Sequence, residues 1–297
     1  MVLNKYNYCN IVFILIFASS FLFLSPQIVY AQTKLNQKGL TLSPLRSELS
    51  INPGTSLDGT LTVTNSTKKV MTVNLTAETF SVINQQYDYA FTEESDVVKW
   101  VTFNHPQVDL VAGQSQKIIY TVGVPLSAEP GGRYISLFAS TDTGLLEEGV
   151  ESRQRIASLL YITVLGDVTR SGHLVSLTSP WLMSGDSSWN VALQNTGTTH
   201  FRSRYNIKVN NIFNEAVVSM SGDALILPGT VRSVSDKLLA PQIPGIYKVV
   251  YTIGLGDTPA IVETRFIIYM PPWATVVATA GITVLIYWFL RKRLSKR

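Results

Sequence analysis

The sequence predicts an all-β fold, with two tandem immunoglobulin-like β-sandwiches followed by one C-terminal transmembrane helix. Apolar and polar residues alternate with a period of two through most of the stretch from Gly39 to Tyr269. Turn signals rich in Gly, Pro and Asn separate these runs, and no convincing long amphipathic helix lies between them. Such alternation is typical of antiparallel sheets with one solvated face, and many short strands at this spacing indicate a sandwich or a barrel.

The first segment, residues 1–31, is expected to be a secretory signal peptide. Lys5 supplies a short positive region, a long apolar run follows, and Ala31 ends a sequence that fits a cleavage site. The mature chain then starts at Gln32 and is exported; an uncleaved anchor is the alternative. Cys9, the one cysteine, lies in this segment, so the mature chain has no disulfide and relies on its apolar cores.

An internal repeat divides the outer region into residues 32–166 and residues 167–270. Each half contains a strand ending in Asn-Ser or Asn-Thr, a later strand opened by Gly and running to a Pro, and a strand led by Pro-Gly and a Tyr. Asn65 and Asn195 end the first of these strands, where an Asn side chain can replace the ladder hydrogen bonds that a turn breaks. Each half is large enough to bury a core. We therefore expect one sandwich in each half.

Two pairs of aromatic residues are expected to have structural roles. Trp100 and Trp189 occur in strand-like runs and are expected in the cores. Tyr134 and Tyr247 follow the Pro-Gly turns of the two halves. Their position resembles that of the corner tyrosine of immunoglobulin-like domains, whose hydroxyl ties two strands together.

The candidate binding residues are aromatic side chains in expected loops. Tyr87 and Tyr89 flank a charged loop, and Trp181 follows a Pro in a Ser- and Gly-rich turn. Exposed aromatic rings stack on sugars or anchor protein interfaces. A purely structural role is the alternative for each of the three.

Residues 271–290 are expected to span a membrane. The run Trp273–Leu290 has eighteen residues without a charge, and an α-helix of that length reaches about 27 Å, enough to cross the hydrocarbon core. A buried core helix is the alternative. Three aromatic side chains suit the membrane interfaces: Trp273, Tyr287 and Trp288. The tail 291–297 is held in the cytoplasm by the positive-inside rule, through basic residues that include Arg291, Lys292 and Arg293.

No motif indicates catalysis or a cofactor. The three histidines, His105, His173 and His200, are far apart in the chain, and no metalloprotease, serine hydrolase or phosphate-loop motif is present. The acidic runs 88–96 and 147–151 lack the spacing of a calcium loop and are expected to be solvated hairpin loops. We therefore expect no enzyme, no metal and no cofactor. A hydrolase whose two carboxylates are brought together by the fold is the alternative.

The formal net charge of +4 comes from the two ends of the chain. Without Lys5 and the five basic residues of the tail, the outer region has a formal net charge of about −2. A region with this balance implies no basic surface for nucleic acid. The basic tail can contact anionic lipid.

Two long segments of the first half follow the sequence pattern of a known family. They are LSPLRSELSINPGTSLDGTLTVTNSTKKVMTVNLTAETF and VVKWVTFNHPQVDLVAGQSQKIIYTVGVPLSAEPGGRYISLFAS. They resemble the opening and the close of the peptidoglycan-binding domain of the WxL-interacting surface proteins of Gram-positive bacteria. The likeness covers most of residues 39–165, and beyond them it rests on layout. The chain departs from the pattern where Arg46-Ser47-Glu48 replaces an Asn-Gln phrase. Pilus-chaperone-like sandwich domains share the turn pattern of both halves.

The resemblance implies cell-surface display, contact with the peptidoglycan of the wall and recruitment of another surface protein. We therefore expect a non-catalytic protein, anchored in the cell membrane by one helix that contacts lipid, whose outer sandwiches bind the wall or a partner surface protein. The alternative is a chaperone-like or accessory subunit of a membrane complex that pairs a sheet edge with its partner. The sequence leaves open the oligomeric state and whether the outer region is extracellular or periplasmic.

Overall fold

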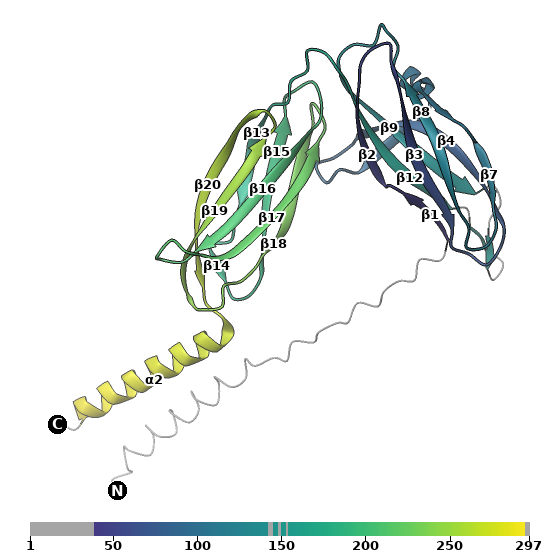
Figure 1. Cartoon of the computed structure of the whole chain (residues 1–297). Helices are drawn as coiled ribbons and strands as arrows, with labels where there is room; N and C mark the ends of the chain where they lie inside the picture. The colour runs from purple at the N-terminus through teal and green to yellow at the C-terminus, as the bar shows by residue number, and fades with distance from the viewer. Residues whose placement is uncertain (1–38, 142–144, 148–149, 153, 295–297) are drawn as a thin grey trace.

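The computed structural model describes residues 39–141, 145–147, 150–152 and 154–294; the expected signal peptide lies outside the described residues. The chain forms two β-sandwiches and one C-terminal apolar helix, which confirms the expected fold class. Figure 1 shows that the sandwiches meet at one end and that helix α2 leaves from the opposite end of the second sandwich.

The first sandwich contains the strands of the first half of the chain. They are β1 (Leu40–Ser43), β2 (Arg46–Ile51), β3 (Ser56–Asn65), β4 (Met71–Val82), β5 (Tyr89–Thr92), β6 (Val101–Phe103), β7 (Gln107–Leu110), β8 (Ser115–Gly123), β9 (Gly131–Thr141) and β12 (Arg155–Val164). One sheet has the order β1-β3-β8-β6. The other, which we call the β9 sheet, has the order β2-β12-β9-β4-β5, with β7 also paired to β4. A 3-10 helix, η2 (Asp96–Trp100), precedes β6, and β10 (Leu145–Glu147) and β11 (Val150–Ser152) form a separate hairpin.

The second sandwich contains the remaining strands. They are β13 (Gly172–Thr178), β14 (Leu182–Met183), β15 (Ser187–Asn195), β16 (Phe201–Asn210), β17 (Ala216–Ile226), β18 (Val231–Leu238), β19 (Gly245–Leu255) and β20 (Thr258–Tyr269). One sheet has the order β13-β15-β18; the other, the β19 sheet, has the order β14-β20-β19-β16-β17. In both sandwiches an edge strand runs parallel to the last strand, β2 beside β12 and β14 beside β20. This shared topology is the structural form of the internal repeat.

The two strand-ending asparagines make the hydrogen bonds that the repeat predicts. Asn65 is fully buried, and its Nδ2 donates to the carbonyls of Lys69 and Leu110 at 2.7 and 2.9 Å. Asn195, also fully buried, makes the equivalent bonds to the carbonyl four residues ahead and to that of the last residue of β17, at 3.0 and 2.8 Å. In each case the side chain replaces the strand that would have continued the ladder.

Each sandwich buries an apolar core between its sheets. Leu61 and Ile118 are fully buried in the first core, and Trp189 and Tyr251 are buried in the second. Burying one such side chain stabilises the fold by about 1.5–3 kcal/mol. The core position expected for Trp189 is confirmed, and Trp100 packs half-buried against the first core.

The two corner tyrosines differ in what they tie together. The Tyr247 hydroxyl donates to the carbonyl of Ile243 at 2.6 Å, as a corner tyrosine does. The Tyr134 hydroxyl instead lies 3.4 Å from Nδ1 of His200 in the second sandwich. Tyr134 therefore links the two sandwiches rather than two strands of its own.

Two residues separate helix α2 (Pro272–Leu294) from the end of β20. By length and composition it can cross a membrane over Pro272–Arg293. Trp273, Tyr287 and Trp288 all lie on it, with both tryptophans exposed. The helix continues beyond the expected end at residue 290, so the basic residues expected in the tail form its last turn; they are Arg291, Lys292 and Arg293. The ammonium group of Lys292 lies 4.8 Å from the centre of the Trp288 ring.

Candidate binding site

The outer face of the β9 sheet carries a cluster of packed aromatic rings. Alternation along its strands sends Leu137 into the core and Phe138 to the outer face. Six rings share this outer face, which we call the aromatic face: Phe80, Tyr89, Phe91, Tyr134, Phe138 and Tyr161. Their centres are close, with 5.1 Å between Phe91 and Phe138 and 5.4 Å between Phe80 and Tyr161. Edge-to-face pairs of this kind stabilise a packed cluster.

The side chain of Tyr87, from the first sandwich, packs into the core of the second sandwich. It lies in the turn between β4 and β5, with a positive φ of 69°. Its hydroxyl accepts a hydrogen bond from the backbone N–H of Leu227 at 2.8 Å and lies 2.6 Å from Oγ1 of Thr230. The guanidinium of Arg232 lies 4.4 Å from the centre of the ring. Burial raises the pKa of the Tyr87 hydroxyl.

The burial of Tyr87 contradicts the exposure expected for it. Only 5% of its surface is exposed, because the second sandwich covers the turn that the sequence suggested would be solvated. The acidic run 88–96 is also more ordered than a hairpin loop, since it includes strand β5, which pairs with β4. In the second acidic run, residues 148–149 lie outside the described residues.

Further contacts between the sandwiches surround Tyr134 and Tyr161 of the aromatic face. The His200 ring packs against both, with ring centres 5.6 and 5.5 Å away. Burial of His200 is the main cause that lowers its pKa to about 4, so the imidazole is neutral at pH 7. Beside it, the guanidinium of Arg202 forms an ion pair with Glu48 of the first sandwich and another with Asp223.

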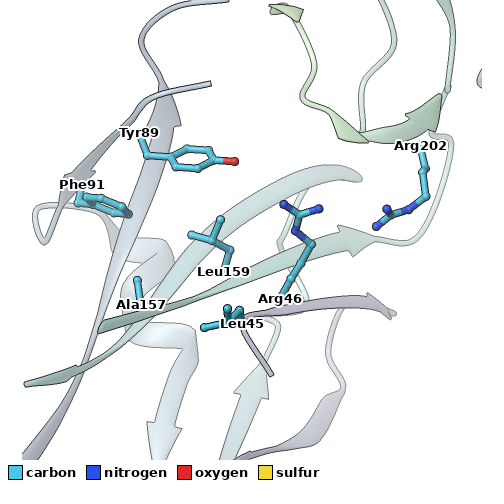
Figure 2. Close-up of a pocket in the computed structure, with 7 residues that line it drawn as sticks. All are labelled: Leu45, Arg46, Tyr89, Phe91, Ala157, Leu159 and Arg202. Atoms are coloured by element: carbon cyan, nitrogen blue, oxygen red, sulfur yellow. The ribbon is translucent and has the colours of Figure 1, made fainter. Parts of the chain in front are cut away.

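A pocket of about 530 Å³ opens where the aromatic face meets the second sandwich. Figure 2 shows the residues that line it: Leu45, Arg46, Tyr89, Phe91, Ala157, Leu159 and Arg202. The apolar side chains form the floor. The guanidinium groups of Arg46 and Arg202 point into the same space, and the hydroxyl of Tyr89 is turned toward them (Figure 2). The pocket therefore combines an apolar surface with two cations at one side.

The two arginines of the pocket differ in their partners. Arg202 is neutralised by the carboxylates of Glu48 and Asp223. Arg46 is exposed and makes no ion pair with any residue of the described chain; its guanidinium lies 5.5 Å from the centre of the Tyr161 ring. A guanidinium without a carboxylate partner next to an apolar floor suits a ligand that carries an anionic group and apolar side chains.

The residues expected to bind are not brought together. Tyr89 is half-buried and lines the pocket. Trp181 is 71% exposed, as expected for an interaction residue, but lies at the far end of the second sandwich, next to the end of β20. A binding role for either remains a prediction. Sequence reasoning missed Arg46, Phe91 and Arg202, and the one available signal was the departure from the family pattern at Arg46-Ser47-Glu48.

The described residues show no constellation for metal chemistry. Within the ranges that the structure describes, no three His, Cys, Asp or Glu side chains are grouped as a metal site requires. The non-enzymatic role expected from the sequence remains a prediction.

Comparisons with known proteins show similarity of fold. No protein-family model matches the chain, and no curated protein matches it either. Similar solved structures include the class 5 fimbrial chaperone CfaA, with 13% identity over 76% of this chain and 99% of that one and a TM-score of 0.42. Another is the CsuC–CsuE chaperone–tip subunit complex of Acinetobacter baumannii, with 14% identity, coverage of 78% and 99%, and a TM-score of 0.38. A third is the E. coli chaperone DraB, with 15% identity, coverage of 76% and 97%, and a TM-score of 0.37.

Likeness at this level does not transfer a function from those proteins to this chain. Membership of the WxL-interacting family remains a prediction, since no family model matches the chain.

Proposed function

We propose that this chain is a non-catalytic envelope protein, anchored in the cell membrane by α2, whose pocket between the sandwiches binds an extended segment of a partner protein. The observation that carries the proposal is the unpaired cation of Arg46 above an apolar floor. An apolar floor can bind the apolar side chains of a peptide, and a free guanidinium can bind one of its carboxylates.

An open strand edge beside the pocket supports the same ligand class. Strand β2 pairs with β12 only from Leu159 onward, so residues 155–158 pair with β9 alone among the described strands. The N–H of Leu159 donates to the carbonyl of Leu45 at 2.9 Å. Because backbone groups alternate along a strand, the N–H of Ala157 points to the same side as that of Leu159, where residues 155–158 have no ladder partner among the described strands and the Ser158 hydroxyl donates to the carbonyl of Pro44 at 2.7 Å. A partner segment can add there as a further strand while its side chains enter the pocket.

The anchor is proposed from α2 and its flanks. Trp273 and Trp288 lie near the two ends of the apolar stretch, where membrane interfaces favour their rings, and the basic turn follows. In this arrangement the sandwiches are extracellular and the C-terminus is cytoplasmic, after export by the signal peptide 1–31.

The test uses photo-crosslinking of the full chain in its native cells. A photoreactive phenylalanine replaces Phe91 in the pocket, and crosslinked peptides are identified by mass spectrometry. We expect one segment of one protein to be captured. Ala157→Pro removes the N–H that would pair with the segment, and Arg46→Gln removes the free cation, so each should abolish the crosslink. Arg204→Gln, an exposed arginine outside the pocket, is the matched control and should leave it unchanged.

The wall-binding alternative is separated by co-sedimentation of the detergent-solubilised chain with insoluble peptidoglycan. Absence of a protein crosslink, together with saturable sedimentation that Arg46→Gln weakens and Arg204→Gln does not, would overturn the partner-segment proposal in favour of peptidoglycan. Absence of both the crosslink and the sedimentation would show that the pocket is not the binding site.

A further inference from the structure

Three loops of the second sandwich gather at the end from which α2 leaves. They are the loop 179–181 between β13 and β14, the hairpin 211–215 between β16 and β17, and the loop 239–244 between β18 and β19. Their shared location follows from the register: Asn210 pairs with Lys248 near the start of β19, and Gly245 pairs with Tyr269 at the end of β20. Figure 1 shows this end of the sandwich beside the start of α2.

Each of these loops exposes large apolar side chains. Trp181 is 71% exposed, Ile212 and Phe213 are 78% and 77% exposed, and Ile243 is 69% exposed. We call these four residues the apolar rim. Loops on a protein surface are ordinarily polar, and exposed large apolar groups that gather in one place mark an interaction surface.

The opposite end of the same sandwich serves as an internal comparison. Its loops, residues 196–200, 227–230 and 256–257, present no exposed large apolar side chain. Two of them contact the first sandwich, through Thr198 and Thr230. Exposed apolar loops are therefore confined to the end that adjoins α2.

Hydrogen bonds to the backbone of two rim residues fix the loops that carry them. The carbonyl of Trp181 accepts from the N–H of Ile268 at 2.9 Å. The carbonyl of Ile243 accepts from the hydroxyl of Tyr247 at 2.6 Å.

The hairpin that carries Ile212 and Phe213 is braced by one side chain. Oδ1 of Asn211 accepts from the N–H groups of Phe213 and Glu215 at 2.9 and 3.0 Å. Its Nδ2 donates to the Glu215 carboxylate at 2.9 Å. The apolar tip is thus a braced turn, not a loose loop that could fold back over its own side chains.

The joint to α2 fixes the rim close to the start of the helix. Only Met270 and Pro271 separate β20 from α2, and the N–H of Met270 donates to the carbonyl of Met183 at 2.8 Å. Ala274, in the first turn of the helix, is buried. Two extended residues span about 7 Å, so if the helix enters a bilayer at Trp273, the rim lies at the level of the lipid headgroups.

We propose that the apolar rim inserts into the outer interface of the bilayer, so that the second sandwich rests on the membrane beside α2. The inference rests on the proposed membrane anchor. The occupant is lipid, because the helix enters the bilayer within two residues of the sheet that presents the rim. Large aromatic and aliphatic side chains on such loops are favoured at the boundary between headgroups and acyl chains.

The test measures the depth of spin labels on the full chain, reconstituted at one copy per phosphatidylcholine–phosphatidylglycerol nanodisc. In a Cys9→Ser background, single cysteines replace Trp181, Phe213 or Ile243, and each label is probed with oxygen and with a water-soluble nickel chelate. These positions lie on exposed loops, so the labels disturb no core contact. We expect oxygen access to rise and nickel access to fall relative to Leu126→Cys, an 83% exposed control on the first sandwich.

A label at Val284→Cys, within α2, separates this inference from the anchor on which it rests. Lipid exposure at position 284 with nickel-accessible labels at all three rim positions would overturn the rim insertion and leave the anchor standing. Nickel access at position 284 would overturn the anchor and the insertion together. One copy per disc excludes a second chain as the cover of the rim.

Discussion

At the scale of single residues, the contact between the sandwiches depends on Tyr87. Its ring packs against the core of the second sandwich. Its hydroxyl accepts a hydrogen bond from the backbone N–H of Leu227, which has no other partner among the bonds of the described chain. A buried N–H that loses its acceptor costs the free energy of its lost hydration. Tyr87 thus has a structural role at the interface between the sandwiches.

Tyr87→Phe should lower the free energy of unfolding by about 1–2 kcal/mol, because the N–H of Leu227 is left buried without an acceptor. Urea unfolding followed by circular dichroism measures the change. Tyr205→Phe is the matched control, since the Tyr205 hydroxyl makes no hydrogen bond within the described ranges, and should change stability by less than about 0.5 kcal/mol. Equal effects of the two substitutions would show that the Tyr87 hydroxyl is not the stabilising group.

His200 makes stability depend on pH. Its folded pKa is about 4 because it is buried, against about 6.5 in an unfolded chain. Between these values the unfolded chain binds a proton that the folded chain does not, so the free energy of unfolding falls as pH drops from about 6.5 to about 4. The whole loss from this group is on the order of 3 kcal/mol and is complete below about pH 4.

His200→Gln should flatten this part of the pH dependence, and unfolding in urea at half-unit steps between pH 4 and pH 7 measures it. His105→Gln, in an exposed loop, is the control and should leave the profile unchanged. A profile that is the same for all three proteins would mean that His200 does not stay neutral on acidification.

At the scale of elements, the two sandwiches share one arrangement of hydrogen-bonded turns at one corner. A buried Asn at the end of a strand donates hydrogen bonds to backbone carbonyls across a turn, and a Gly with positive φ lies in the neighbouring turn, Gly113 in the first sandwich and Gly229 in the second. Each Gly also donates its N–H to the carbonyl of the Asn, at 2.9 and 3.0 Å. The repeat in the sequence is therefore a repeat of turn chemistry rather than of core residues.

Asn65→Ala and Asn195→Ala should each lower the free energy of unfolding by about 2–4 kcal/mol, because each removes buried or half-buried hydrogen bonds to two carbonyls and to one N–H. Denaturant titration of the full chain measures both. Asn206→Ala, on the outer face of β16, should cost less than about 0.5 kcal/mol. Losses at Asn65 and Asn195 as small as that of the control would contradict the role of these turns.

The strands and these turns could be predicted because their signals are local. Alternation reports which face of a strand is buried, and Asn and Gly each mark a turn by residue type, although the bond from Asn65 to Leu110 then crosses 45 positions of sequence. The pocket could not be predicted in this way. Tyr87 meets Leu227 across 140 positions of sequence, and Arg46 meets Arg202 only because two sandwiches pack together. Nothing near Tyr87 in the sequence distinguishes a tyrosine covered by another domain from one left in water.

At the scale of the whole molecule, the sandwiches and the helix are joined by two short, hydrogen-bonded connections. One is the interface around Tyr87 and His200; the other is the two-residue joint between β20 and α2. The proposed anchor therefore determines how the entire outer part is held.

Deletion of residues 273–297 should move the protein from the membrane fraction to the soluble fraction of the cell envelope. The physical reason is the loss of the apolar helix, the one segment of the described chain long and apolar enough to cross a bilayer. Fractionation followed by immunoblotting measures the shift, with the full chain washed in alkaline carbonate as the control. A deletion variant that stays with the membrane would contradict anchoring by α2.

In the proposed arrangement, the short joint after Tyr269 also determines which partners the pocket can reach. A chain on a long flexible stalk samples many heights above a membrane, and its effective concentration for any one neighbour is low. With only two residues between β20 and α2, the proposed anchor restricts the heights that the pocket can sample. Another protein of the same membrane whose binding segment emerges at one of those heights meets the pocket at a high effective concentration, even where its intrinsic affinity is weak. A segment carried on a shorter stalk never meets the pocket, so selection between partners is achieved by reach as well as by contact.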